Sequence, residues 1–401
     1  MSLINYLNDD NIWNEFLLYK QNSNHIPTKE IIKLEKYIKN KTYKEITNDI
    51  NNYNFTTPKK ILIDKLGKKK KRIVYTFNKS EMYILKLLSH LLYKYDYLFS
   101  PNLYSFRKNK SVKCAIYNFF KTKNLNNMYA YKVDISNYFN SIPINELLKN
   151  LKQDLNDNNL FNLINKILSE KNIQYKNEII EDNNKGIMAG IPISAFLANY
   201  YLKELDEYFY KHNILYARYA DDIIVFGNTE KEITEYKNII KSHIYHKNLT
   251  INNEKEFLYK PHDEFEFLGF SFKNNEIDIS NNTFKKIKGK IKRTSRGLRR
   301  WMIKKNATSE VTLKAINRKF NKKFFGKNEN ELSWKYWFFS VITTDKTLKL
   351  IDKYMQEEQR FIITGKHNKK NYEKVTYELL KKCNYKSLVN EYYKSKNLLK
   401  K

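Results

Sequence analysis

The segment LYARYADDIIVFG, residues 215–227, places two adjacent carboxylates, Asp221 and Asp222, between two apolar stretches. This pattern predicts a hairpin of two strands with the acids at its tip. One interpretation is a solvated turn, since aspartate favours turns. The apolar strands on both sides favour a second interpretation, in which a partner neutralises the acids, because a carboxylate close to buried surface is costly without one. The hairpin therefore predicts a cation-binding site.

A second acid has a similar setting in YKVDISNYF, residues 131–139. Val133 and Ile135 point to one face of a predicted strand, and Asp134 points to the other. If this strand neighbours the hairpin, Asp134 and Asp221 converge into a site of oxygen ligands suited to Mg²⁺. Two such ions, about 3.5–4 Å apart, serve nucleotidyl transfer, one at the attacking oxygen and one at the leaving group. The pattern alone leaves the adjacency of the two strands open.

Predicted strands and helices alternate through the middle third of the chain, which favours an α+β fold. Helical segments are expected before and after this region. In the first third we expect helices at 11–19 and 28–40, strands at 61–65 and 72–77 joined at Gly67, and a helix capped by Ser80. Further on we expect a strand at 128–135, a helix after Pro143, a helix at 194–211, a hairpin at 215–226, a strand at 264–272 and a helix opened by Asp345.

The chain of 401 residues carries 74 basic and 43 acidic side chains, a formal net charge of +31. Such an excess suits a partner that carries phosphates. The abundance of Lys, Asn, Ile and Tyr also fits AT-biased coding, so the total charge is a weak indicator. Its distribution says more, because residues 281–309 hold eleven cations and no acid, with apolar residues at helical spacing. We predict a helix with one buried and one cationic face, either simply solvated or tracking phosphates.

Several classes of protein are excluded by the sequence. No apolar run approaches the roughly 18 residues of a membrane-spanning helix, and the first residues lack the layout of a secretory signal. Cys114 and Cys383 are too few for a disulfide framework or a cysteine-rich zinc site. We therefore expect a cytoplasmic protein without a membrane partner.

Short motifs that follow one another in order between about residues 60 and 275 resemble those of reverse transcriptases. YADD (219–222) resembles their YxDD box, and Asp134 resembles the acid of their first palm motif. The segment GIMAGIPISAFLANYYL (186–202) resembles the family's template-binding loop and helix. LTINNEK (249–255) resembles the motif that ends in a lysine near the triphosphate, and EFLGF (266–270) resembles the primer-grip turn. KRI (71–73) and YSFR (104–107) are similar to the fingers motifs of bacterial group II intron and retron relatives.

The resemblance implies an α+β right-hand polymerase with fingers, a palm built on an antiparallel sheet, and a helical thumb. The implied domains are a helical N-terminal extension (1–55), fingers (56–127), a palm with inserted fingers elements (128–278), and a helical thumb with a C-terminal domain (279–401).

The resemblance also implies roles for individual residues. Two Mg²⁺ ions, or Mn²⁺ as the alternative, would be held by Asp134 and Asp221, with Asp222 in support. Lys255 would donate a proton to the pyrophosphate, unless it is one more surface lysine. The incoming nucleotide would contact Lys71, Arg72, Phe139 and Ala189. Template and primer would contact Arg107, Gly190, Pro192, Gly269, Lys288 and Lys292.

Phe139 lies five positions after Asp134, where the family has a bulky residue under the sugar that favours dNTPs. The alternative is that Phe139 is simply a core residue. Ala189 departs from the family pattern, because many relatives have Gln at this position, and template or nucleotide positioning there is in doubt. The chain also lacks the Val-Thr-Gly thumb box of typical retron enzymes and shows no ribonuclease H or zinc-bearing endonuclease section.

These departures make the chain most similar to stand-alone bacterial reverse transcriptases of the abortive-infection and defence-associated groups. The implied function is RNA-directed DNA synthesis in antiphage defence, with a noncoding RNA as template, dNTPs as substrates and DNA as product. One alternative is a terminal nucleotidyltransferase that is template-independent or protein-primed. Another is a nucleic-acid-binding scaffold with a vestigial polymerase core. The oligomeric state stays open.

Overall fold

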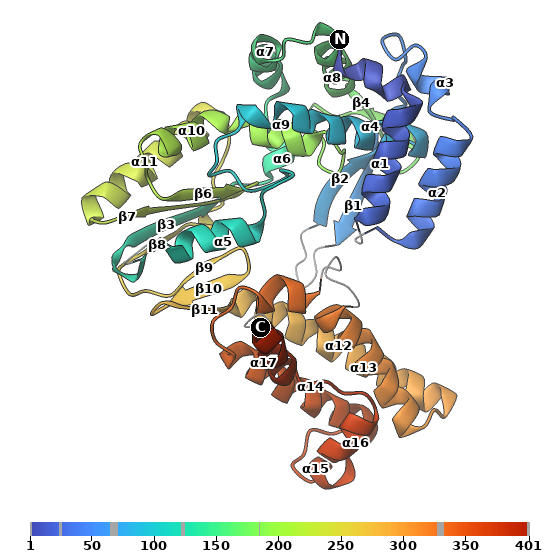
Figure 1. The fold of residues 1–401 in the computed structure, drawn as a ribbon, viewed down its shortest axis with the longest axis vertical. Helices are drawn as coiled ribbons and strands as arrows, with labels where there is room; N and C mark the ends of the chain where they lie inside the picture. The colour runs from blue at the N-terminus through green and yellow to red at the C-terminus, as the bar shows by residue number, and fades with distance from the viewer. Residues whose placement is uncertain are drawn as a thin grey trace. The chain divides into compact units, whose positions relative to one another are not determined.

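The computed structural model describes residues 2–23, 26–64, 71–121, 125–183, 185–326 and 333–398 (Figure 1). The chain divides into two units, the first with two β-sheets and the second with one. The first unit comprises Met1–Phe119 and Asn127–Lys260, and the second comprises Phe120–Asn126 and Pro261–Lys401. The predicted division into fingers, palm and thumb is a functional one and stays a prediction.

The first unit begins with helices, as the sequence predicts. Their bounds are η1 Leu3–Asn8, α1 Asp10–Asn22, α2 Thr28–Lys39, α3 Lys44–Thr47, α4 Lys79–Leu91 and η2 Leu92–Leu98. The predicted cap of α4 is wrong, because Ser80 lies inside the first turn. Asn78 caps the helix instead: its side chain accepts from the Glu81 amide, while the Glu81 side chain accepts from the Asn78 amide. This reciprocal pair satisfies two backbone donors that a helix start leaves open.

A four-stranded sheet follows these helices, with the strand order β2-β1-β4-β5. Its strands are β1 Lys59–Asp64, β2 Lys71–Thr76, β4 Asn172–Tyr175 and β5 Glu178–Glu181. The predicted strand pair is confirmed, since β1 and β2 pair antiparallel from Lys59 opposite Thr76 to Asp64 opposite Lys71. The predicted turn at Gly67 lies outside the described residues.

The second sheet of this unit carries the predicted acids and has the order β6-β7-β3-β8, with every neighbouring pair antiparallel. Its strands are β3 Tyr129–Asp134, β6 Tyr216–Tyr219, β7 Asp222–Gly227 and β8 Phe257–Tyr259. Other elements of the unit are α5 Val112–Lys121, α6 Tyr138–Ser141, α7 Ile144–Asp154, α8 Asn158–Ser169, α9 Ser194–Tyr201, α10 Lys203–Lys211, α11 Glu230–His246 and η4 Asn253–Lys255. The short η3, Leu125–Asn127, includes residues of both units. Helices α10 and α11 pack against this sheet (Figure 1).

The predicted α+β fold with an antiparallel sheet is confirmed, and so is the adjacency of the two acid-bearing strands. The single helix expected at 194–211 is instead two helices, α9 and α10. The chain bends between them at Leu202, whose φ of −111° and ψ of 17° are not helical. Apolar periodicity continues across such a bend, so the sequence pattern does not reveal it.

The second unit holds a three-stranded sheet, order β11-β10-β9, and a helical part. Its elements are β9 Phe265–Phe267, β10 Phe270–Lys273, β11 Glu276–Ile279, α12 Asn281–Lys305, α13 Ser309–Phe325, the π-helix η5 Lys335–Phe339, α14 Lys346–Thr364, α15 Asn371–Lys374, α16 Tyr377–Lys382 and α17 Leu388–Leu398. The strand expected at 264–272 is a hairpin, because Leu268 and Gly269 have positive φ angles of 51° and 91° and reverse the chain.

The predicted basic helix is α12, and its two-faced character is confirmed. Ile287 and Ile291 are buried, while Lys288 and Lys292 are exposed. The prediction that Asp345 opens a helix is also confirmed, since it precedes α14. Across the described ranges, none of the helices combines the length and the apolar character that a membrane span requires.

Candidate active site

The turn between β6 and β7 presents the two adjacent acids. Tyr219 and Asp222 are the last paired residues, so Ala220 and Asp221 form a two-residue loop. Ala220 has a φ of +58° and is 7% exposed. A left-handed backbone conformation costs a residue other than glycine about 1–2 kcal/mol. The tip of this hairpin therefore holds a strained, buried residue directly before Asp221.

Asp134 meets this turn from the neighbouring strand. It is the last residue of β3, lies directly opposite Asp222 in the antiparallel register, and is 4% exposed. The amide of Ile135 donates to the carbonyl oxygen of Asp221 at 3.1 Å. The structure thus brings Asp134 together with Asp221 and Asp222, which lie 87 and 88 positions later in the chain. The sequence hypothesis requires this proximity.

The burial and proximity of these acids change the pKa values of the groups around them. Burial raises the pKa of Asp221 to about 6, and the negative charges of Asp134 and Asp222 add to this rise. Lys255 neutralises part of this charge, with Nζ 2.6 Å from Asp134 Oδ2. Burial acts to lower the pKa of Lys255, but the hydrogen bond and charge of Asp134 outweigh it, so that pKa is raised. Lys255 therefore holds its proton firmly.

The donor set fits a divalent metal in chemistry and charge, because carboxylate oxygens are the ligands that Mg²⁺ prefers. Burial, and after it the charges of Asp134 and Asp222, raise the pKa of Asp221, and a cation beside these acids would favour the charged carboxylate. As the side chains stand, no three His, Cys, Asp or Glu residues in the described part of the chain form a ready metal cluster. One oxygen of Asp134 is engaged by Lys255 instead.

Phe139 and Ala189 lie on segments that meet near this sheet. Phe139, in α6, is half-buried, and its ring packs edge-on against Phe106 with centroids 6.1 Å apart. The ring of Phe106 in turn lies 6.3 Å from the Tyr219 ring, at the end of β6 before Ala220 and Asp221. The Ala189 amide donates to Asn140 Oδ1 at 2.9 Å, which ties the 186–193 loop to α6.

The same loop is also tied to β2. The Ala189 carbonyl accepts from the Tyr75 amide at 2.7 Å. Gly190 follows with a φ of +105°, and a Cβ there would lie 2.8 Å from the Tyr75 carbonyl oxygen. A glycine is therefore required for the close approach of the two backbones. Pro192 is half-buried just before α9.

Lys71 and Arg72 begin β2 and are both exposed. Lys71 Nζ lies 3.7 Å from Asp64 Oδ1 in an ion pair that is itself solvent-exposed. Such a pair contributes little to stability. Both cations are therefore accessible to an anion, and their role in nucleotide binding stays a prediction.

Arg107 is bonded within its own chain, and its contact with a template stays a prediction. Its guanidinium donates to both carboxylate oxygens of Asp96, at 2.7 and 2.8 Å, and to the carbonyl oxygens of Ser100 and Leu103. The side chain is 7% exposed. An arginine with a bidentate carboxylate partner is bound to its own chain. We therefore assign Arg107 to holding the loop between η2 and α5.

Three of the predicted contacts belong to the second unit. Gly269 occupies the turn of the β9–β10 hairpin with a φ of +91°, and its carbonyl accepts from Thr283 Oγ1 at 3.3 Å. Lys288 lies over the Tyr354 ring at 4.8 Å, and Lys292 is exposed on the same helix. Their contact with template and primer stays a prediction.

Sequence reasoning missed the residues that hold the turn. The Ala220 amide donates to Ser105 Oγ at 2.9 Å, and Arg218 donates to the Ala220 carbonyl. The motif at 104–107 thus contacts the turn before Asp221 through its serine, which bonds to Ala220. One signal was present: an arginine inside an otherwise apolar strand must be paired within the fold.

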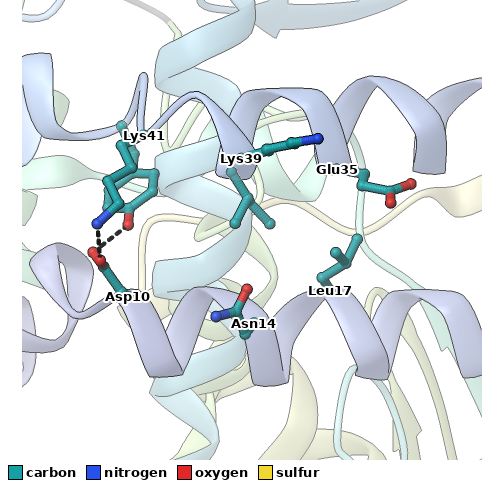
Figure 2. Close-up of a pocket in the computed structure, with 8 residues that line it drawn as sticks. Asp10, Asn14, Leu17, Glu35, Lys39 and Lys41 are labelled. Carbon is teal, nitrogen blue, oxygen red and sulfur yellow. Dashed lines mark hydrogen bonds and ion pairs between the residues drawn. The ribbon is translucent and has the colours of Figure 1, made fainter.

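The groove that Figure 2 shows lies away from these acids. It has a volume of about 330 Å³ and is lined by residues of α1 and α2 and of the turn after α2. At one end of the groove Asp10 pairs with Lys41 at 2.5 Å and accepts from the Tyr43 hydroxyl. Hydrogen bonds from Lys41 and Tyr43 hold the pKa of Asp10 well below its usual range. None of the three acids lines this groove.

Comparison with known proteins agrees with the sequence motifs. Residues 58–272, more than half of the chain, match the family described as reverse transcriptase (RNA-dependent DNA polymerase). The chain is 31% identical over 161 residues to an uncharacterized 91 kDa protein in a cob intron of Schizosaccharomyces pombe, covering 39% of this chain and 19% of that protein. It is 24% identical over 197 residues to the retron Ec86 reverse transcriptase of Escherichia coli, covering 48% of this chain and 56% of that enzyme.

The chain thus spans 19% and 56% of the lengths of these two relatives. Among solved structures, apo telomerase from Candida tropicalis is similar at a TM-score of 0.46 and 14% identity, over 82% of this chain and 69% of that one. The paired acids lie inside the matched region. The chain belongs to the reverse transcriptase family of RNA-dependent DNA polymerases.

Proposed function

We propose that this protein is an RNA-directed DNA polymerase that extends a primer on an RNA template with dNTPs. One observation carries the proposal: Asp134 and Asp222 lie opposite each other on neighbouring antiparallel strands, with Asp221 on the adjoining turn. This arrangement lies within the region that matches the family. In the reaction the primer 3′-hydroxyl attacks the α-phosphate of a dNTP and pyrophosphate leaves.

The carboxylates of Asp134 and Asp221, supported by Asp222, would hold two Mg²⁺ ions, or Mn²⁺ in their place. When bound, such ions supply Lewis-acid stabilisation of the charge that develops on the phosphate oxygens. Lys255 carries a firmly held proton at Nζ beside these acids and would pass it to the pyrophosphate.

The exposed cations of β2 would bind the triphosphate. Arg72 offers a planar fork of donors that suits phosphate oxygens, and Lys71 adds a second charge beside it. Phe139 would lie under the sugar, where its ring excludes a 2′-hydroxyl. Replacing it by alanine is expected to raise ribonucleotide incorporation at least tenfold, whereas Phe161→Ala, in α8, should leave the preference unchanged.

The cationic face of α12, with Lys288 and Lys292, would contact the template–primer duplex through its phosphates. We further propose a cytoplasmic role in antiphage defence with a noncoding RNA as template. The similarity to a retron reverse transcriptase and the absence of a membrane-spanning helix among the described residues support this setting.

Primer extension tests the proposed activity. Purified protein with an RNA template, a primer, dNTPs and Mg²⁺ should synthesise complementary DNA, and Asp221→Asn should not. Glu235→Gln, an exposed acid on α11, removes one carboxylate without touching the site and should keep full activity. Synthesis by Asp221→Asn at the wild-type rate would defeat the proposal.

A second candidate is untemplated nucleotide addition. It is favoured by Ala189, whose methyl group stands where many relatives have a glutamine that can form hydrogen bonds. Sequencing the product separates the two activities, because templated synthesis gives the complement of the RNA. Random or homopolymeric DNA made without any template would support the terminal transferase.

A further inference from the structure

The backbone of Ala220 is held in a conformation that residues other than glycine avoid. Its φ of +58° lies in the left-handed region, at the first central position of the turn between Tyr219 and Asp222. Both turn types that two-residue hairpins favour need a positive φ there, and glycine, asparagine or aspartate normally supplies it. An alanine keeps this conformation only where its surroundings fix it.

Both polar groups of the Ala220 backbone are bonded to buried side chains. Its amide donates to Ser105 Oγ at 2.9 Å, and its carbonyl accepts from Arg218 Nη1 at 3.3 Å. Ser105 and Arg218 are each 0% exposed. Ser105 reaches the turn from the connection before α5, whereas Arg218 belongs to β6. The strained residue is therefore fixed from two segments of the chain.

A buried polar network also holds the side chains of Ser105 and Arg218 in place. Ser105 Oγ donates to Asn199 Oδ1 at 2.9 Å, and Asn199 Nδ2 donates back to the Ser105 carbonyl at 2.8 Å. Arg218 Nε donates to Asp206 Oδ1 at 2.8 Å, and Nη2 donates to the Asn199 carbonyl at 2.9 Å. Because a buried charge or amide without a partner is costly, this network strongly favours one arrangement of the turn.

The other side of the turn is bonded to β3 through the Ile135 amide and the Asp221 carbonyl. The backbone is therefore fixed on both sides of the Asp221 side chain. The buried network bonds to Ala220 before it, and the Ile135 amide bonds to the Asp221 carbonyl after it. We infer that Ser105 and Arg218 are positioning residues that aim the Asp221 carboxylate at Asp134. The inference rests on the proposed polymerase function, since it gives these two residues a role in the same site.

Removing the Ser105 hydroxyl tests this role. Ser105→Ala should lower kcat for nucleotide addition at least tenfold and raise the Mg²⁺ concentration for half-maximal activity at least threefold. The KM for dNTP should stay within twofold, because the triphosphate contacts are untouched. Ser105→Thr keeps the hydroxyl and should recover most of the loss. Arg218→Lys keeps the charge but not the fork of donors, and should behave like Ser105→Ala.

A control for simple destabilisation is available in the same unit. Thr47 is 5% exposed, and its Oγ1 donates to Asn8 Oδ1 at 2.9 Å, the same bond that Ser105 makes to Asn199. Thr47→Val removes a part-buried hydrogen bond of the same chemical type far along the chain from the acids. It should lower Tm comparably yet leave kcat and the Mg²⁺ requirement unchanged. Equal losses of kcat in Thr47→Val and Ser105→Ala, or full kcat in Ser105→Ala, would overturn the inference.

A measurement without substrate separates this inference from the proposed function. Mn²⁺ binding to the full chain, followed by electron paramagnetic resonance, should be at least fivefold weaker in Ser105→Ala than in the wild type and unchanged in Thr47→Val. If the wild type binds Mn²⁺ through Asp221 but synthesises no DNA, the function fails while a weaker Ser105→Ala still supports positioning. If neither Mn²⁺ binding nor synthesis occurs in the wild type, both are overturned.

Discussion

The ammonium group of Lys255 lies 2.6 Å from Oδ2 of Asp134, which stands 121 positions earlier in the chain. This pair joins η4 to the end of β3 at the point where the three acids meet. The lysine thus neutralises part of the negative charge of the site. In the proposed reaction the same ammonium is a proton source beside the leaving group.

Lys255→Gln is expected to slow nucleotide addition about 10²–10⁴-fold, the usual contribution of a positioned general acid. Single-turnover kinetics with dNTP in excess measures this step directly. Lys211→Gln removes an exposed lysine that pairs with Glu207 on α10, and should leave the rate unchanged. A Lys255→Gln rate equal to that of wild type would assign this lysine to charge balance alone.

The raised pKa of Asp221 makes the free energy of unfolding depend on pH. The pKa is about 6 in the folded chain and 3.8 as the ordinary value, so the folded state binds more protons between about pH 4 and pH 6. The metal-free protein should therefore lose stability as pH rises through this window. The contribution of this group is about 3 kcal/mol at most, from about 1.4 kcal/mol per pKa unit.

Urea unfolding at about pH 4 and pH 7 measures this dependence. Asp221→Asn lacks the ionisable group and should be more stable than the wild type at pH 7 but not at pH 4. Glu235→Gln should follow the wild type at both values. Adding Mg²⁺ at pH 7 should stabilise the wild type more than Asp221→Asn. A wild type and an Asp221→Asn variant with identical pH profiles would contradict the electrostatic picture.

Gly190→Ala should damage the loop that Ala189 anchors to β2. Its Cβ would come 2.8 Å from the Tyr75 carbonyl oxygen, at a φ of +105° that alanine does not readily adopt. We expect a loss of about 2 kcal/mol or more in the free energy of unfolding. Gly297→Ala is the comparison, because its Cβ would meet nothing within 4 Å in the helix α12. That change should stabilise by about 0.5–1 kcal/mol, and denaturant melts distinguish the two signs.

Lys288 and Lys292 on α12 should contribute to nucleic-acid affinity through phosphate contacts. Changing both to glutamine is expected to weaken binding of an RNA–DNA duplex and to lower the salt slope of log K by about 2, one for each lost contact. Lys369 and Lys370 are also exposed and also in the second unit. Changing Lys369 and Lys370 to glutamine should leave the salt slope of log K unchanged. Fluorescence anisotropy across a salt series measures the affinity and the slope for both double variants. An unchanged slope for the α12 variant would make this helix a solvated basic face.

Local features of the fold followed from the sequence with good accuracy. Apolar alternation predicted β3 and the β6–β7 hairpin, and helical spacing predicted α12 with its buried Ile287 and Ile291. These patterns succeed because side-chain periodicity depends on near neighbours in the chain. The Ser80 cap and the strand at 264–272 were wrong for local reasons, since Asn78 competes for the cap and Gly269 turns the chain.

The sequence by itself determined which acids are present and which motif each belongs to, because residue identity and spacing are properties of the chain. Only the tertiary structure decided that Asp134 lies opposite Asp222, and that Arg107 turns inward to Asp96 while Ser105 holds Ala220. The Asp134–Asp222 pairing and the bond between Ser105 and Ala220 join residues 88 and 115 positions apart. No periodicity within one segment specifies such partners, since they are selected by how the packed segments satisfy their buried polar groups.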